Sequence, residues 1–139
     1  LDLKKNQQGL EIGTGSGYQR AFLAEFCAGL YTVELLAELQ KQAKERLRGL
    51  GYHNIHYKVG DGSLGWAEHA PYERIMVTAA AKRMPLPLIE QLAPGGIMII
   101  PVGPLGWQEL MQVTKDSEGN IEQKKLLDVA FVELVGKYS

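Results

Sequence analysis

Residues 10–18 read LEIGTGSGY, and this stretch decides the fold. Three glycines, Gly13, Gly15 and Gly17, follow an apolar run directly and precede a helical pattern. Glycine has no Cβ and tolerates positive φ angles, so a strand that ends in such a turn lets the backbone approach a ligand closely. The following helix points its unpaired N–H groups at the same place. The stretch predicts a strand, a ligand-binding turn and a helix, although the same turn can form without a ligand.

The glycine spacing separates two classes of cofactor. The dinucleotide fingerprint needs glycines at the first, third and sixth places. With Gly13 as the first place, the sixth is Tyr18. The pattern present is acid-x-Gly-x-Gly-x-Gly, in which Glu11 is the acid. A second acid, Glu34, ends the apolar run 30–34 (LYTVE), about where an acid accepts hydrogen bonds from ribose hydroxyls. Taken alone, Glu34 is equally compatible with an ordinary surface acid.

Length and composition narrow the class of protein. A chain of 139 residues suffices for one domain, which we place at residues 1–139. Fifteen basic and sixteen acidic residues leave a net charge of −1, so neither nucleic acid nor a membrane surface is an expected partner. Cys27 is the only cysteine, and we expect it to be buried. No apolar run reaches the length of a membrane span, and we expect a cytoplasmic monomer.

The rest of the chain alternates strand and helix patterns. Strands are expected at about 9–13, 30–33, 54–59, 74–79 and 97–102, and helices at about 18–28 and 85–92. The clearest helix follows Glu34, where one apolar stripe runs through Leu36, Leu39, Ala43, Leu47 and Leu50. Residues 63–70 suggest a loop with about one helical turn. The runs 108–115 and 125–135, joined by polar residues 116–120, predict a closing β-hairpin. The fold class is therefore α/β, with a mostly parallel sheet and one reversed strand.

Two turns at predicted strand ends carry further candidates. Asp61 lies between Gly60 and Gly62, where it can either meet the base edge of a nucleotide-like cofactor or simply form a turn. The alanines 79–81 follow the fourth strand, and their small side chains either leave room for a second molecule or allow close packing. The histidines show no spacing typical of metal ligands, so no metal site is expected.

Six segments together closely resemble the protein-L-isoaspartate O-methyltransferase family of class I S-adenosylmethionine-dependent methyltransferases: LEIGTGSGYQ, YTVE, LGYHNIHYKVGDGSLGW, APYERIMVTAAA, LIEQLAPGG and IIPVGP. The resemblance covers essentially the whole chain in order. It implies a doubly wound, Rossmann-like sheet of seven strands. It also implies transfer of a methyl group from S-adenosylmethionine to the free carboxylate of isoaspartyl residues in damaged proteins and peptides. The methyl ester then collapses to a succinimide, which reopens in part to normal aspartate, so the reaction repairs protein.

The same resemblance assigns site residues. Those implied for the cofactor, or its product S-adenosylhomocysteine, are Glu11, Gly13, Thr14, Gly15, Ser16 and Gly17 near the methionine end, Glu34 and Leu35 at the ribose, and Asp61 and Gly62 at the adenine. Those implied near the acceptor peptide are Ala79, Ala80, Ala81 and Gln108. An acceptor carboxylate is already ionised at neutral pH, so catalysis needs positioning and desolvation more than an acid–base pair.

One departure from the family concerns the catalytic residue. The family carries a hydroxyl residue in a Gly-Gln-Thr-Ile-Ser-like loop before the first strand, and no such loop occurs in this sequence. We expect the catalytic hydroxyl and the lid over the cofactor to lie upstream of Leu1. The 139-residue chain is then expected to bind the cofactor weakly and to methylate poorly or not at all. Robust turnover of an isoaspartyl peptide by this chain would contradict that expectation.

Other functions remain open on the residues alone. A catalytically silent S-adenosylmethionine-binding module would act through a protein partner. A nucleotide-binding oxidoreductase is disfavoured by Tyr18 and by the closing hairpin. A nucleic-acid methyltransferase would call for a basic surface, or for an Asn/Asp-Pro-Pro-aromatic motif where residues 78–81 read TAAA.

Overall fold

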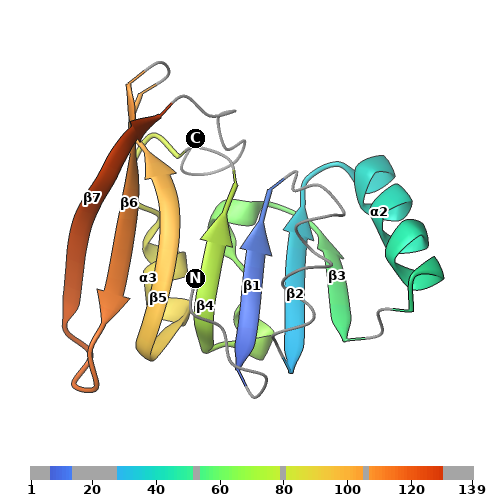
Figure 1. Ribbon diagram of the computed structural model, residues 1–139, viewed down its shortest axis with the longest axis horizontal. Helices are drawn as coiled ribbons and strands as arrows, with labels where there is room; N and C mark the ends of the chain where they lie inside the picture. The colour runs from blue at the N-terminus through green and yellow to red at the C-terminus, as the bar shows by residue number, and fades with distance from the viewer. Residues whose placement is uncertain (1–6, 14–27, 52–53, 79–80, 105–106, 130–139) are drawn as a thin grey trace.

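The computed structural model describes residues 7–13, 28–51, 54–78, 81–104 and 107–129 (Figure 1). Seven strands form one sheet in the order β3-β2-β1-β4-β5-β6-β7. Their bounds are β1 (Gln8–Ile12), β2 (Gly29–Glu34), β3 (Ile55–Val59), β4 (Tyr72–Val77), β5 (Leu92–Val102), β6 (Gln108–Lys115) and β7 (Ile121–Val129). Strands β1 to β5 pair in parallel, β6 pairs antiparallel with β5, and β7 pairs antiparallel with β6. The predicted mixed sheet with one reversed strand, β6, is confirmed.

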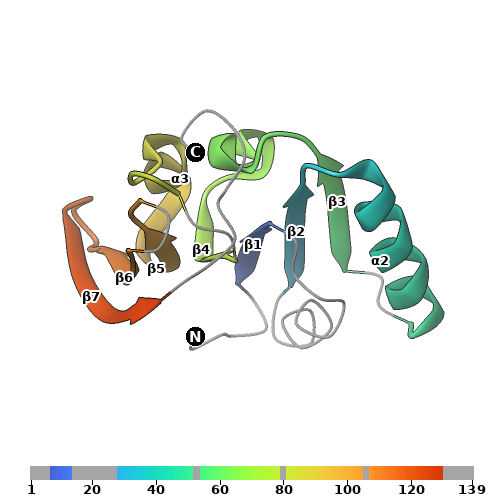
Figure 2. The ribbon, with the colours of Figure 1, turned by 90° about the horizontal axis from the view of Figure 1, so that it is seen from above.

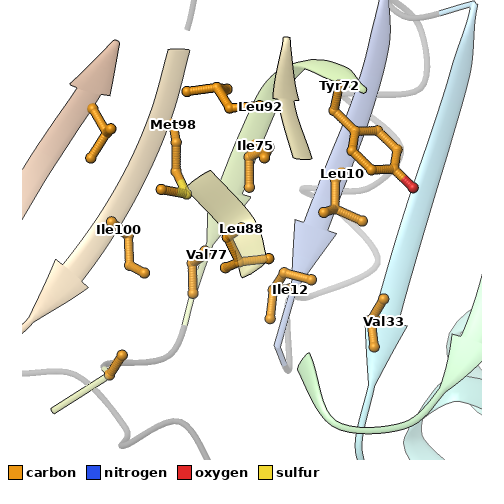
Figure 3. Close-up of a cluster of buried hydrophobic side chains, with 12 residues drawn as sticks. Leu10, Ile12, Val33, Tyr72, Ile75, Val77, Leu88, Leu92, Met98 and Ile100 are labelled. Atoms are coloured by element: carbon orange, nitrogen blue, oxygen red, sulfur yellow. The ribbon is translucent and has the colours of Figure 1, made fainter. Parts of the chain in front are cut away.

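Helices cover both faces of this sheet (Figure 2). On one face, α3 (Leu86–Gln91) inserts Leu88 into a core formed with Leu10, Ile12, Val33, Ile75, Val77, Met98 and Ile100 (Figure 3). On the other face, α2 (Ala37–Gly49) packs Leu47 against Leu30 and Ile55. Successive strand residues point to opposite faces, so strands buried on both sides are apolar almost throughout. The architecture is doubly wound, as predicted.

The stripe predicted for α2 is only partly buried. Ala43 and Leu47 are buried, whereas Leu36, Leu39 and Leu50 are 53%, 41% and 66% exposed. The polar Gln40 is buried instead, because its Nε2 donates to the main-chain oxygen of Lys58 at 3.0 Å and lies 3.4 Å from that of Thr32. This helix packs on β2 and β3, the last two strands on one side of the sheet. A narrow apolar contact is therefore sufficient to hold it.

Several predicted boundaries shift. Strand β4 begins at Tyr72 rather than residue 74, and β5 begins at Leu92 rather than residue 97, with a break in register after Tyr72. Strand β7 begins at Ile121, four residues before the predicted start. Residues 63–70 belong to two short 3-10 turns, η1 (Gly62–Leu64) and η2 (Ala67–His69), and their connections. The helix predicted at 18–28 and Cys27 lie outside the described residues, except for Ala28.

The described helices are too short or too polar to cross a bilayer. In the same part of the chain, no group of three His, Cys, Asp or Glu residues is placed to hold a metal ion.

Candidate functional site at the carboxyl edge of the sheet

The carboxyl ends of the parallel strands are tied together by main-chain hydrogen bonds. Gly13 follows β1 with a φ of 114°, and its N–H donates to the oxygen of Val33 at 3.1 Å. The N–H of Gly60 donates to the oxygen of Glu34 at 3.0 Å. Thr78 donates both its N–H and its hydroxyl to the oxygen of Ile12, at 2.9 and 3.0 Å. A ligand that met this edge would therefore meet a rigid rim. Thr14, Gly15, Ser16 and Gly17 lie outside the described residues.

A buried carboxylate closes β2. Glu34 is 2% exposed, and its Oε1 accepts a hydrogen bond from the N–H of Leu36 at 3.2 Å. Burial of a carboxylate at a strand end is costly unless hydrogen bonds offset the lost hydration. Hydroxyl groups of a ligand at this position could also donate to the same carboxylate. Glu34 is therefore no ordinary surface acid.

Three partly exposed apolar side chains lie at the strand ends and the turn that follow this acid in the chain or in register. Leu35 follows Glu34, Val59 pairs with it in register, and Leu64 lies in η1; these three are 43%, 49% and 45% exposed. Exposed apolar side chains beside a buried polar group are typical of a small-molecule site, where flat apolar rings gain from contact. The arrangement suits a planar base next to a polyhydroxyl group.

Asp61 has a clear structural role. Its Oδ1 accepts hydrogen bonds from the N–H and the hydroxyl of Ser63, at 3.0 and 2.7 Å, and so caps η1. Gly62 is buried in the same turn. The turn-forming alternative is therefore observed, while contact of Asp61 and Gly62 with a cofactor stays a prediction.

Glu11 lies within the sheet, two positions before Gly13. It is fully buried and pairs in register with Thr32 on β2 and Met76 on β4. Arg74, which is 6% exposed, lies two positions before Met76 and therefore projects to the same face as Glu11. Sequence reasoning did not single out Arg74; the signal available was a cation at the start of the apolar run 75–77. A cofactor contact of Glu11 stays a prediction.

The far end of the edge is formed after β4 and β5. Ala81 is buried, donates its N–H to the oxygen of Pro101 at 3.0 Å and accepts from the N–H of Gly103 at 2.8 Å. Its small side chain thus serves close packing between two strand ends, the alternative that the sequence left open. Ala79 and Ala80 lie outside the described residues.

Gln108, at the start of β6, differs from every other buried amide described. It is 1% exposed, and neither its Oε1 nor its Nε2 has a hydrogen-bond partner within the described ranges. A Cβ on Gly103 would come within 3.2 Å of the Gln108 Cα, which places this glutamine at the carboxyl end of β5. A buried amide without partners is costly, and a ligand can supply the missing bonds.

A family model described as protein-L-isoaspartate(D-aspartate) O-methyltransferase (PCMT) matches residues 1–139. A protein-L-isoaspartate O-methyltransferase of Dictyoglomus thermophilum is 54% identical over 138 residues, which cover 99% of this chain and 62% of the relative. One of Picosynechococcus sp. is 51% identical over 127 residues, covering 91% of this chain and 56% of the relative. The chain thus spans about three fifths of the length of these curated relatives.

Solved structures agree with the fold. A structure titled protein-L-isoaspartate O-methyltransferase matches with a TM-score of 0.86 and 27% identity, over 98% of this chain and 44% of that one. A Plasmodium falciparum structure, titled as a putative enzyme of this kind in complex with S-adenosyl-L-homocysteine, matches with a TM-score of 0.80 and 24% identity. The second match covers 94% of this chain and 66% of that one, and it shows the fold alone.

Proposed function

Because the chain belongs to the protein-L-isoaspartate(D-aspartate) O-methyltransferase family, we propose that it takes part in methyl transfer from S-adenosylmethionine to the free carboxylate of isoaspartyl residues. The acceptors are damaged proteins and peptides, and the reaction leads to their repair. The match of the family model over residues 1–139 is the observation that carries this proposal.

The residues at the carboxyl edge fit an adenosine-containing cofactor. Two neighbouring ribose hydroxyls match the buried carboxylate of Glu34, and an adenine ring matches the exposed apolar side chains of Leu35, Val59 and Leu64. The turn that begins at Gly13 would take the methionine end. Asp61 and Gly62 would flank the base, and Glu11 would support the turn from within β1.

S-adenosylmethionine, when bound, supplies an electrophilic methyl group on a sulfonium centre. The residues of this chain bind and orient, and they have no need to remove a proton, because the acceptor carboxylate is already ionised. Positioning of the two reactants and exclusion of water account for most of the rate. The rim of hydrogen bonds that joins Gly13, Val33, Ile12 and Thr78 keeps the binding edge rigid.

We assign Gln108 to the acceptor side of the site. Its amide can donate to a carboxylate or main-chain oxygen of the acceptor and accept from a main-chain N–H. Its position beside Gly103 and β5, across the edge from Glu34, supports a separation between cofactor and acceptor. Ala79, Ala80 and Ala81 would lie between the two.

We further propose a cytoplasmic monomer. The net charge of −1 supports protein partners over nucleic acid or a membrane surface. Analytical ultracentrifugation tests the monomer. Electrophoretic mobility shifts with DNA and RNA test the absence of nucleic-acid binding.

The experiment that tests the function measures methyl transfer from radiolabelled S-adenosylmethionine to an isoaspartyl peptide. The same peptide with normal aspartate is the control. Both this chain and a version extended at its N-terminus to the length of its relatives are assayed. Labelling of the isoaspartyl peptide alone supports the proposal. Binding of S-adenosylhomocysteine by calorimetry without labelling by either version would instead support a silent cofactor-binding module.

A further inference from the structure

A cavity lies at the outer edge of the sheet, apart from the candidate site at the carboxyl edge. Strand β3 ends the strand order on this side, and α2 runs beside it (Figure 1). The cavity has a volume of about 320 Å³. It is lined by Lys44 and Arg48 of α2, by residues 55–57 of β3, and by Trp66 and His69. These β3 residues begin the strand, whereas Gly60 and Asp61 of the candidate site follow its end.

The walls of this cavity are cationic and aromatic. No acidic side chain is among its described lining residues, although Glu45 and Glu68 are neighbours in sequence of two of them. The Nζ of Lys44 lies 5.7 Å from the ring centre of Tyr57, and the Nζ of Lys58 lies 5.8 Å from that of Trp66. None of Lys44, Arg48 and Lys58 forms an ion pair with another described residue. The whole chain has a net charge of −1, so this cluster is a local concentration of positive charge.

The positive charges flank β3 from both faces of the sheet. Residue 57 projects to the face that α2 covers, where Lys44 lies over its ring. Residues 56 and 58 project to the opposite face, where His56 stacks on Tyr31 with ring centres 4.6 Å apart and Lys58 lies over Trp66. The charges are therefore spread along the edge and do not converge on one point. A single small anion needs convergent donors, whereas an extended polyanion can contact charges on both sides.

We propose that this edge binds an acidic segment of another polypeptide in an extended conformation. Strand β3 has five residues and is about 16 Å long, which an extended segment of four to five residues matches. Side chains of such a segment alternate in direction, so carboxylates can reach Lys44 and Arg48 on one side and Lys58 on the other. Single-stranded nucleic acid is disfavoured, because its binding needs a longer basic track than three cations provide.

This site would help to select acceptor proteins, a role that rests on the proposed function. The segment bound along β3 and the residue held at the carboxyl edge would belong to one acceptor. Acidic stretches near an isoaspartyl residue would then lower the KM for that acceptor and leave kcat unchanged.

The test measures the fluorescence anisotropy of a labelled octaglutamate peptide, which contains no isoaspartate and needs no cofactor. The double charge reversal K44E/R48E is expected to weaken binding about tenfold. The matched control K41E/R46E changes two exposed cations of the same helix that do not line the cavity, and it is expected to change affinity less than twofold. Circular dichroism and the affinity for S-adenosylhomocysteine check that both variants fold.

Each remaining outcome decides against the proposal. Equal weakening by the two double variants would show diffuse attraction to α2. Binding of oligo-dT or oligo-U as tight as that of octaglutamate would assign the edge to nucleic acid, and no peptide binding at 20 mM salt would remove the site. Because these readouts need no methyl transfer, failure of the proposed reaction leaves them interpretable. Failure of the peptide to bind likewise says nothing against the reaction.

Discussion

Two buried glutamines use the same amide group in opposite ways. Gln91 accepts a hydrogen bond from the N–H of Trp66 at 2.9 Å and donates one to the oxygen of Leu64 at 2.8 Å. It thereby fastens the chain around η1 and η2 to α3. Gln108 is more deeply buried and makes neither kind of bond within the described residues. One amide is satisfied by the fold, and the other has no partner among the described residues.

The same contrast separates two regions of the molecule. Around η2, polar and aromatic groups satisfy one another: Tyr31 stacks on His69 with centres 4.6 Å apart, and the hydroxyl of Tyr72 donates to the oxygen of Trp66. Burial raises the pKa of the Tyr72 phenol, so it remains a neutral donor. At the carboxyl edge, a buried carboxylate ends β2 and a buried amide begins β6. The first region contributes to the stability of the fold, and the second is the region that we propose for binding.

Removal of the carboxylate at the end of β2 is the strongest test of the binding region. The Glu34→Ala variant is expected to lose roughly 2–4 kcal/mol of binding free energy for S-adenosylhomocysteine, which is about 30- to 1000-fold in Kd, because two hydroxyl bonds to a charged acceptor are lost. Isothermal titration calorimetry measures this change. Glu38→Ala, an exposed acid in the first turn of α2, is the control and should bind normally. Unchanged affinity in Glu34→Ala would show that the cofactor does not bind at this edge.

Removal of the satisfied amide tests the structural region. Gln91→Leu leaves the part-buried N–H of Trp66 without its acceptor and the oxygen of Leu64 without its donor, so the free energy of unfolding should fall by about 2–3 kcal/mol. Urea unfolding measures it. Gly65→Ala should also destabilise, because Gly65 has a φ of 64° and a Cβ would overlap the Gln91 amide. A Gln91→Leu variant that kept full stability would remove the contrast between the two glutamines.

Removal of the unsatisfied amide should give the reverse result. Gln108→Met keeps the volume of the side chain and removes the unpartnered polar atoms, so the free energy of unfolding should stay the same or rise by about 1 kcal/mol. Methyl transfer to an isoaspartyl peptide should fall about tenfold in kcat/KM, with cofactor affinity preserved. Urea unfolding and the transfer assay on the extended chain measure the two effects. A loss of stability equal to that of Gln91→Leu would make Gln108 a structural residue.

Sequence reasoning identified the sheet because its signals are local. Apolar runs, glycine turns and the closing hairpin each follow from neighbouring residues, so the order of elements and the reversed β6 could be predicted. Boundaries moved where tertiary contacts prevailed. Strand β5 begins at Leu92 because residues 94–96, which precede the predicted strand, are accommodated inside it by a register shift. The leucine stripe of α2 overestimated burial, because periodicity does not tell how wide a surface a helix meets.

The candidate site was predicted in part for the same reason. Glu34 was named from the acid at a strand end and Gln108 from the family resemblance, and the structure adds that both are buried. Sequence patterns cannot show whether a polar group is satisfied, since its partners come from distant segments, as Gln91 and Leu64 illustrate. Asp61 was ambiguous because one residue pattern suits both a cap and a ligand contact. The cationic edge at β3 was missed, because Lys44 and Lys58 belong to different elements.

The turn between β6 and β7 is expected to give the smallest effect on stability. Its carboxyl group is hydrogen-bonded but exposed, so it tests hydrogen bonding apart from burial. Asp116 is exposed, and it accepts hydrogen bonds from the N–H groups of Glu118 and Asn120 at 2.9 and 2.8 Å. The bonds from Asn120 hold the pKa of the Asp116 carboxyl below its usual value. Since folding lowers this pKa, the contribution to stability is present above the ordinary carboxyl pKa of about 4 and is lost as the pH falls through the lowered value.

Asp116→Ala should therefore lower Tm slightly at pH 7, and the difference from the unchanged chain should shrink below about pH 4. Thermal unfolding followed by circular dichroism at pH 7 and pH 3 measures it. Glu118→Ala is the control, because only the main chain of Glu118 takes part in the turn. A loss at pH 7 as large as that of Gln91→Leu would mean that hydrogen-bond satisfaction outweighs burial. The contrast between Gln91 and Gln108 would then need another cause.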